Sequence, residues 1–223
     1  MNIVAILGSP HGKNGNTAKL LAEMTQAAER AGAAVTTLLL SEYSVQPCGA
    51  CDACHKTGVC PIKDDFKLVR ARMEQADGII LASPNYIFSV SAQLKALLDR
   101  CCGPIHLQNM TGKYGAAVVT SGGEGAEEVE AYLLRVLQSL GCWTVGSAGA
   151  NAAQLYDEQA RAAVLKAAAA LGANLVNAIR TREIFAEQVP ARQAFFERMK
   201  YIVSMNRDSW KYEYRFWSEQ GRL

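Results

Sequence analysis

Two spacings of apolar residues alternate along the first 180 positions. Nearly continuous apolar runs, as in buried parallel strands, cover 2–8, 34–40, 78–83, 114–121 and 142–148. Between them, apolar residues at helical spacing predict helices over 17–31, from Asp64 or Asp65 to about 76, and over 91–102, 125–140 and 157–180. Because parallel neighbours need crossover helices, the alternation predicts an α/β fold with a doubly wound five-stranded parallel sheet.

The tail, residues 183–223, differs in composition from this core. It is crowded with aromatic residues: Phe185, Phe195, Phe196, Tyr201, Trp210, Tyr212, Tyr214, Phe216 and Trp217. Such density is normally buried. We therefore expect one domain at 1–182, with a cysteine-rich loop inserted at 47–61. A C-terminal helix and arm at 183–223 would cover either its own domain or a neighbouring subunit.

Net charge and cysteine content limit the possible partners and the cellular compartment. A formal charge of +2, from 23 Lys and Arg against 21 Asp and Glu, provides no basic stripe for nucleic acid. No basic region precedes the first apolar run, and Lys or Glu interrupts every long one, so we expect neither a signal peptide nor a membrane span. An odd count of seven cysteines without a leader favours a reducing cytoplasm over disulfides.

Three loops follow predicted strand ends, where ligands bind in such sheets. The first, from Gly8 to Thr17, runs straight into a helix and offers backbone N–H groups and the Ser9 and Asn16 side chains to a phosphate. It lacks the spacing of triphosphate or dinucleotide loops, which favours a monophosphate. An ordinary capped turn is the alternative. The loop at 83–91 carries aromatic and amide groups suited to a flat ring, and the loop at 120–125 allows close backbone approach.

The most specific motif is Cys48-x2-Cys51-x2-Cys54-x5-Cys60-Pro61. Closely spaced thiols followed by Cys-Pro are typical of ferredoxin-type segments that hold a [4Fe–4S] cluster, although the last gap is five residues and not three. Zinc also accepts four thiolates, but zinc sites usually present two separated Cys-x2-Cys pairs. Free or redox-active thiols are the third possibility. The sequence favours the cluster, with Cys48, Cys51, Cys54 and Cys60 as ligands.

These loops resemble the NADPH-dependent FMN reductase branch of the flavodoxin-like proteins. The likeness covers about residues 1–180 and rests on Gly8-Ser9-Pro10, Gly15-Asn16-Thr17, Ser83-Pro84-Asn85-Tyr86 and the run from Ser91 to Arg100. It implies FMN, with the phosphate at the first loop and the isoalloxazine ring at the other two. The implied cofactor-binding residues are Ser9, His11, Asn14, Asn16, Thr17, Pro84, Asn85, Tyr86, Ile87, Phe88, Ser121, Gly122 and Gly123.

With all four cysteines present after the second strand, the chain is also similar to the iron-sulfur flavoproteins. That resemblance implies a homodimer or homotetramer. The other cysteines, Cys101, Cys102 and Cys142, are assigned to packing. Arg100 is expected to stabilise a helix C-terminus, where a cation interacts favourably with the helix dipole. His106 is expected to lie in a loop without a catalytic role.

A flavin accepts two electrons as hydride and releases them singly, and a cluster carries one. We therefore expect an FMN- and [4Fe–4S]-containing oxidoreductase that moves electrons between NAD(P)H or ferredoxin and a small-molecule acceptor. No catalytic side chain is required. Two alternatives stay open. One is an FMN-dependent dehydrogenase or reductase of a specific small molecule, with Tyr86, Phe88 and the aromatic tail lining its pocket; the other is a non-enzymatic electron carrier or redox sensor.

Overall fold

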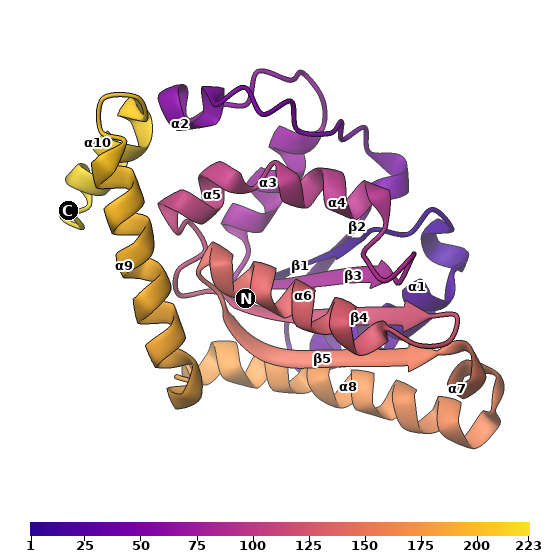
Figure 1. Ribbon diagram of the computed structural model, residues 1–223. Coiled ribbons are helices and arrows are strands. Elements are labelled where there is room, and N and C mark those ends of the chain that lie inside the picture. The colour runs from indigo at the N-terminus through magenta and orange to yellow at the C-terminus, as the bar shows by residue number, and fades with distance from the viewer.

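The computed structural model describes residues 1–223 and places a parallel sheet between two layers of helices (Figure 1). The strands are β1 (Asn2–Leu7), β2 (Ala34–Leu39), β3 (Gly78–Pro84), β4 (Tyr114–Ser121) and β5 (Trp143–Asn151). Their order is β2-β1-β3-β4-β5, and every neighbouring pair is parallel. This is the flavodoxin-like order, so the predicted five-stranded sheet is confirmed.

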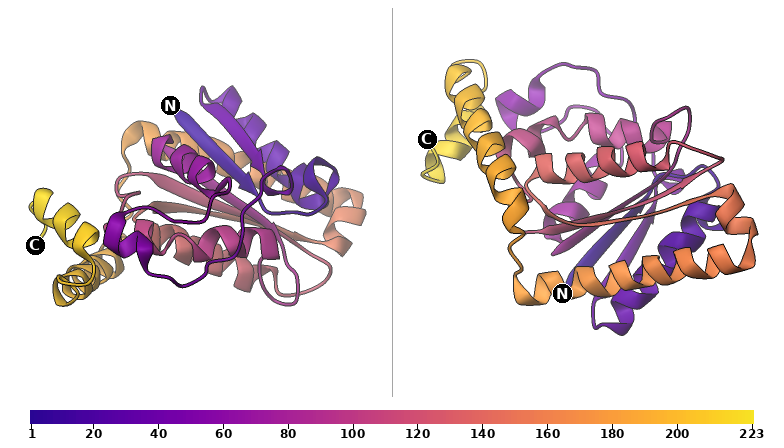
Figure 2. Two further views of the ribbon diagram at one scale, coloured as in Figure 1. Left: turned by 90° about the horizontal axis from the view of Figure 1, so that it is seen from above. Right: turned by 60° about the horizontal axis from the view of Figure 1, so that its bottom comes forward.

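Helices cover both faces of the sheet (Figures 1 and 2). One face packs on α1 (Asn16–Arg30) and α8 (Glu158–Thr181), and the other on α3 (Phe66–Gln75), α4 (Ala92–Asp99) and α6 (Ala126–Leu140). The shorter helices are α2 (Ala53–Thr57), α5 (Cys102–Leu107) and α7 (Ala152–Tyr156). Alternate residues of β1 point to opposite faces, so Ile3, Ala5 and Leu7 join one core and Val4 and Ile6 the other.

Three expectations about the elements need correction. The run at 34–40 forms an edge strand that is mostly exposed, because only β1 pairs with it. The helix predicted over 91–102 ends at Asp99, and α5 begins at Cys102. Pro104 lies two residues further on; it has no N–H to donate to a preceding turn, so one continuous helix is disfavoured. His106 therefore lies in α5 and not in a loop.

Helix α8 is relevant to the expectation that the chain has no membrane span. By length and composition alone it could cross a bilayer, although Lys166 interrupts its apolar run. In this fold α8 lies along the sheet, and its buried residues join the same core as α1 and β1. Gly172 permits the close approach, since an added Cβ would come within 2.1 Å of the Met24 carbonyl oxygen on α1.

The C-terminal tail forms α9 (Val189–Met205) and α10 (Lys211–Glu219). It packs on α5 through a small core of Leu107, Met199, Val203 and Trp217. Figure 1 shows this arm beside the amino ends of β4 and β5, while the ligand loops lie at the carboxyl ends. The aromatic tail therefore does not line the ligand loops of its own chain, contrary to that part of the small-molecule hypothesis.

Candidate functional site

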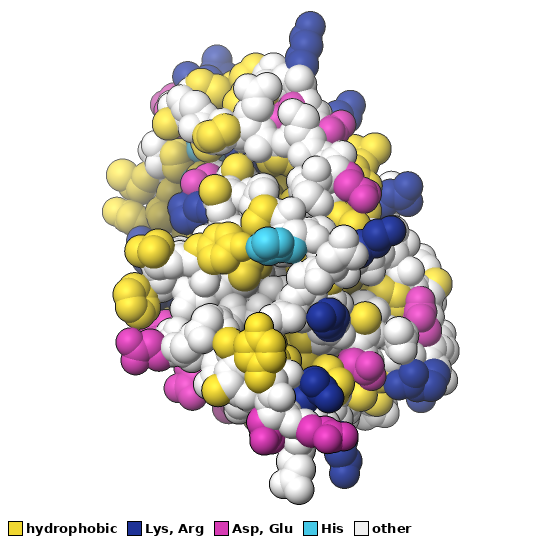
Figure 3. All heavy atoms as spheres, turned by 90° about the vertical axis from the view of Figure 1, so that its right-hand side faces the viewer, with side chains coloured by type: hydrophobic (Ala, Val, Ile, Leu, Met, Phe, Trp, Pro, Cys, Tyr) yellow, Lys and Arg dark blue, Asp and Glu magenta, His cyan; other side chains and the backbone are white.

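The three loops that were expected to bind a ligand meet at the carboxyl edge of the sheet. The backbone N–H of Gly8, after β1, donates to the Ala82 carbonyl at 2.8 Å, and that of Asn85, after β3, donates to the Thr120 carbonyl at 2.7 Å. Figure 3 shows this side of the molecule, where exposed hydrophobic side chains lie near a histidine, with charged side chains scattered around them. The fold therefore brings the predicted residues of all three loops to one face.

The first loop leads into a helix whose leading N–H groups have no side-chain cap. Helix α1 begins at Asn16 after Gly15, and no side chain accepts from its first turn. Thr17 is buried, with its Oγ1 2.6 Å from Thr120 Oγ1, which ties this turn to β4. Ser9 is buried too, whereas the side chains of His11, Asn14 and Asn16 are exposed. An uncapped helix start of this kind suits an anionic group.

The second loop contains a tight turn with unusual backbone angles. Tyr86 and Ser89 exchange two backbone hydrogen bonds, and the two residues between them have positive φ, 50° at Ile87 and 58° at Phe88. Such angles normally call for Gly, Asn or Asp, and a β-branched residue there is an outlier. Ile87 is 92% exposed and Phe88 69% exposed. Strain that displays apolar side chains is typical of ligand-binding loops.

Asn85 connects the second loop to the third. Its Nδ2 donates to the Glu124 carbonyl at 3.0 Å, while its buried Oδ1 has no hydrogen-bond partner. Gly125, at φ 79°, makes room for this side chain, because an added Cβ would lie 2.7 Å from Nδ2. Nearby, the Ser121 hydroxyl donates to the Gly123 carbonyl at 3.1 Å. Asn85 Oδ1 is thus a buried acceptor whose hydrogen-bonding capacity is not used within the chain.

The four clustered cysteines line one cavity of about 210 Å³ on a different side of the fold. The loop that carries them runs between β2 and α3 and includes left-handed residues at Ala50 (φ 49°) and Asp52 (φ 58°). A zinc ion with Zn–S bonds of about 2.3 Å would hold its thiolates about 3.8 Å apart. The one group of three or more potential ligand atoms within 4.8 Å of one another includes none of these four cysteines; it consists of His55, Cys102 and His106 at the edge of the cavity. The cavity therefore suits a group larger than a single ion.

Arg100 forms the inner wall of this cavity. Its Nη2 donates to the Cys60 sulfur at 3.2 Å, its Nη1 contacts Asp64 Oδ2 at 2.5 Å, and its guanidinium lies 4.2 Å from the centre of the Phe66 ring. Although burial opposes ionisation, the Arg100 hydrogen bond holds the pKa of Asp64 below its usual value. The role expected for Arg100 at a helix end was therefore incomplete: it is a buried cation that connects Asp64 to Cys60.

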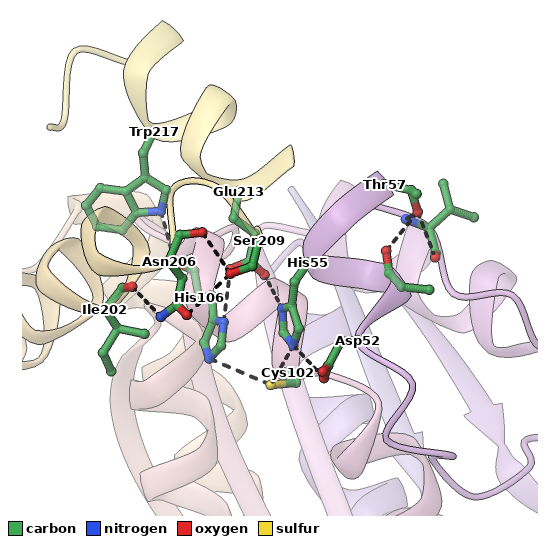
Figure 4. A network of polar contacts seen from close by, with 12 residues as sticks. Asp52, His55, Thr57, Cys102, His106, Ile202, Asn206, Ser209, Glu213 and Trp217 are labelled. Atoms are coloured by element: carbon green, nitrogen blue, oxygen red, sulfur yellow. Dashed lines mark hydrogen bonds and ion pairs between the residues drawn. The ribbon is translucent and has the colours of Figure 1, made fainter. Parts of the chain in front are cut away.

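A second cluster lies beside the cavity, where α2, α5 and α10 meet (Figure 4). The Cys102 sulfur lies 3.8 Å from His55 Nε2 and 3.7 Å from His106 Nε2. The other ring nitrogens contact the two oxygens of Glu213, His55 Nδ1 at 2.6 Å and His106 Nδ1 at 3.0 Å. Glu213 is fully buried. The assignment of Cys102 to packing was therefore wrong, whereas Cys101 and Cys142 are buried as expected.

These contacts shift the pKa values of all four groups. Hydrogen bonds from His106 and His55 lower the pKa of the Cys102 thiol to about 6. Contacts with Cys102, Cys54 and Glu213 raise the pKa of His55 to about 12. Burial opposes the charged form of His106, but contacts with Cys102 and Glu213 raise its pKa to about 9. Burial also disfavours the Glu213 anion, yet the two rings hold its pKa below the ordinary value.

Part of this cluster was visible in the sequence. Cys102 and His106 are four residues apart, a spacing that puts two ligand atoms on the same face of a helix. His55 directly follows Cys54 of the cysteine motif. Glu213, however, is 107 residues from His106 and contributes from the C-terminal arm, so no local pattern indicates it.

Known proteins resemble this chain in sequence and in fold. A family model described as NADPH-dependent FMN reductase matches residues 1–157. The chain is 32% identical to an iron-sulfur flavoprotein of Archaeoglobus fulgidus over an alignment of 228 residues that covers 99% of each chain. It is 36% identical over 146 residues to an iron-sulfur flavoprotein of Methanosarcina thermophila, covering 64% of this chain and 72% of the relative.

Among solved structures, the Trp repressor binding protein from Bacillus subtilis shares the fold with a TM-score of 0.57. It is 21% identical, and the match covers 77% of this chain and 99% of that one.

Proposed function

Given that this chain belongs to the NADPH-dependent FMN reductase family, and within it to the iron-sulfur flavoproteins, we propose that it is an FMN-dependent oxidoreductase that also holds a [4Fe–4S] cluster. The observation that carries the proposal is the placement of the two sites along α4. Ser91 caps the start of α4 beside the flavin loops, and Arg100 follows its end at the wall of the cysteine cavity. An eight-residue helix is about 12 Å long, so one short rigid element connects the two sites.

The flavin loops fit FMN by their unsatisfied groups. The uncapped start of α1, with Ser9, Asn16 and Thr17, would hold the phosphate. His11 and Asn14 are proposed to contribute from the same loop. The buried Asn85 Oδ1, which lacks a partner, would accept a ring N–H.

The turn at Tyr86–Phe88, with Pro84 before it, would lie against the ring. The loop of Ser121, Gly122 and Gly123 would approach the ring through its backbone, and neither glycine has another atom within 4 Å of an added Cβ. When bound, FMN would supply hydride acceptance and one-electron release. The protein residues bind and orient it.

The cysteine cavity fits a [4Fe–4S] cluster by its donor set. Cys48, Cys51, Cys54 and Cys60 surround one space and are not gathered tightly enough for a single ion. Cys48 and Cys51 are exposed, and Cys54 and Cys60 are half-buried. Arg100 would donate a hydrogen bond to one ligand sulfur, a contact of the kind that tunes the potential of such clusters.

The electron donor proposed here is a nicotinamide, in line with the description of the family. The flavin edge is open to it, because the apolar tips of Ile87 and Phe88 are exposed and the C-terminal arm lies at the opposite edge of the sheet. Electrons would then leave one at a time by way of the cysteine cavity to an acceptor.

The test is to purify the chain without oxygen and to measure FMN, iron and acid-labile sulfide per chain. We expect about one FMN with about four iron and four sulfide. Cys48→Ser should lose iron and keep FMN, whereas Asn85→Ala should weaken FMN binding and keep iron. NADPH oxidation should require FMN, and one-electron acceptor reduction should also require the cluster. Flavin without iron would reduce the proposal to a simple FMN reductase, and iron without flavin would overturn it.

A further inference from the structure

The cluster of Cys102, His55 and His106 contains none of the four cysteines proposed as iron ligands, although His55 and Cys102 also line the edge of the cysteine cavity. Its three ligand atoms, one sulfur and two Nε2 nitrogens, lie within 4.8 Å of one another. The residues come from α2 and α5, and the whole group sits against α10 of the C-terminal arm (Figure 4). Because the three donors converge from two separate helices, they form a compact potential binding site and are not merely neighbours along one polar surface.

The spacing of these donors matches the coordination sphere of one metal ion. With Zn–S of about 2.3 Å and Zn–N of about 2.05 Å, tetrahedral coordination places sulfur and nitrogen about 3.6 Å apart. The observed sulfur–nitrogen distances are 3.8 Å to His55 and 3.7 Å to His106. Both sulfur–nitrogen distances therefore exceed the tetrahedral value by only about 0.1 to 0.2 Å.

The outer contacts are those of a metal-bound histidine pair. Metal-ligating imidazoles usually give their second ring nitrogen to a carboxylate, which fixes the tautomer and the ring orientation. Here one buried carboxylate, Glu213, serves both rings through its two oxygens. The Trp210 ring stacks on both imidazoles, with centroids 4.5 Å from His55 and 4.8 Å from His106, and limits their rotation.

Charge balance also favours a divalent cation at this point. The Cys102 thiolate and the buried Glu213 carboxylate together carry two negative charges, and burying them is costly without two positive charges nearby. A divalent ion bound by the Cys102 sulfur and the two Nε2 atoms would supply both positive charges at this point.

We propose that Cys102, His55 and His106 bind a zinc ion, separate from the [4Fe–4S] cluster, with Glu213 as the residue that positions both histidines. One thiolate and two imidazoles suit Zn²⁺, which takes a fourth ligand from water or a nearby carboxylate. Asp52 offers such a group, with its Oδ1 4.0 Å from His55 Nε2. The ion would join α2, and with it the cysteine loop, to α5 and the C-terminal arm.

The first test is elemental analysis and zinc K-edge X-ray absorption on the anaerobically purified full chain, after equilibration with a zinc salt. We expect one zinc per chain, with one sulfur neighbour at about 2.3 Å and two nitrogen neighbours at about 2.0 Å. Absence of zinc would overturn the proposal. A shell of four sulfurs would also overturn it, because it would place zinc on Cys48, Cys51, Cys54 and Cys60 and remove the cluster as well.

Variants separate this site from the cluster. Cys102→Ser and His106→Gln should lose zinc while iron, sulfide and FMN stay at wild-type levels. Glu213→Gln should weaken zinc binding about 10- to 100-fold in competition with a chelator. Cys101→Ser is the matched control; it is the adjacent cysteine, its sulfur contacts the Leu97 carbonyl instead, and zinc should be retained. Retention of zinc in Cys102→Ser would refute the assignment, and loss of iron there would make Cys102 a cluster ligand.

Discussion

The guanidinium Nη2 of Arg100 lies 3.2 Å from the sulfur of Cys60, and the Nη1 of the same side chain contacts Asp64. The Arg100 and Asp64 side chains are each only 1% exposed, so the N–H donor is held in place and its charge is neutralised locally. The Phe66 ring, 4.2 Å from the guanidinium, fixes its plane. A donor fixed in this way acts on the electronic state of whatever the sulfur binds.

We predict that Arg100→Lys lowers the reduction potential of the proposed [4Fe–4S] cluster. A lysine can keep the charge beside Asp64, but it lacks the second arm that reaches Cys60. Hydrogen bonds to ligand sulfurs favour the reduced, more negative state. A loss of about 1.4 kcal/mol of this preference corresponds to about 60 mV for one electron, measured by an anaerobic redox titration. Arg70→Lys is the control, because Arg70 lines the same cavity but pairs with Glu74. The reduction potential measured in Arg70→Lys should equal that of the wild type.

The sheet and the ligand loops could be predicted because local patterns encode them. The strand runs are short and apolar, and the loop from Gly8 to Thr17 leads directly into a helix. Once the strand order is known, the loops after β1, β3 and β4 must meet at one edge. The four clustered cysteines were visible for the same reason, since all lie within one short segment.

The Cys102 cluster could not be predicted in full, because it depends on packing between distant segments. The break between α4 and α5 sets the direction of Cys102 and His106, and a periodicity that continues through residue 102 conceals that break. Glu213 reaches the rings only after the arm docks through Trp217, whose indole N–H donates to the His106 carbonyl at 3.0 Å. Aromatic composition indicates that the arm is buried but not where.

Ile87→Gly should stabilise the flavin-free protein. A left-handed backbone costs a residue with a Cβ about 1–2 kcal/mol, and Gly avoids most of that cost although it adds entropy to the unfolded chain. The expected net gain is about 1 kcal/mol, or a rise in Tm of about 2–4 °C. FMN binding, measured by fluorescence titration, should weaken about tenfold through loss of the apolar side chain.

Ile184→Gly is the control for this substitution. Ile184 is also apolar and 69% exposed but does not have a positive φ, so Gly there should lower the Tm. Equal changes at the two positions would show that the turn at Ile87 stores no strain.

Glu130 should make the protein less stable as the pH rises. Burial raises the pKa of Glu130. The Glu130 carboxylate lies beside Gly149 and accepts a hydrogen bond from the Ser147 hydroxyl at 2.5 Å. The folded state therefore binds this proton more tightly than the unfolded state. The contribution to stability is fully present below the unfolded pKa of about 4.3 and is lost as the pH rises through the higher folded value.

Glu130→Gln should flatten this part of the pH profile and raise the Tm near pH 7 by a few degrees at most, read by thermal unfolding between pH 4.5 and 8. Glu128→Gln, an exposed position on the same helix, should leave the profile unchanged. If Glu130→Gln leaves the dependence of Tm on pH unchanged, ionisation of Glu130 does not destabilise the folded protein.

The last prediction concerns the contact between the cysteine loop and the C-terminal arm. Gly58 ends α2 at φ 78°, and an added Cβ would lie 2.5 Å from the Tyr212 ring on α10. Gly58→Ala should therefore cost about 1–2 kcal/mol of backbone strain and, in addition, push the arm away from the loop. Gly112→Ala separates these effects, because Gly112 has a similar φ of 85° and nothing within 4 Å of an added Cβ.

In urea unfolding, Gly58→Ala should lose more stability than Gly112→Ala, and limited proteolysis should cut its arm faster. Adding Tyr212→Ser to Gly58→Ala should recover part of the difference, because it removes the ring that the new methyl group meets. If the two glycine variants lose the same stability and resist protease equally, the arm does not support the cysteine loop. If only Gly58→Ala also loses iron, the arm holds the cysteine loop in the conformation that binds the cluster.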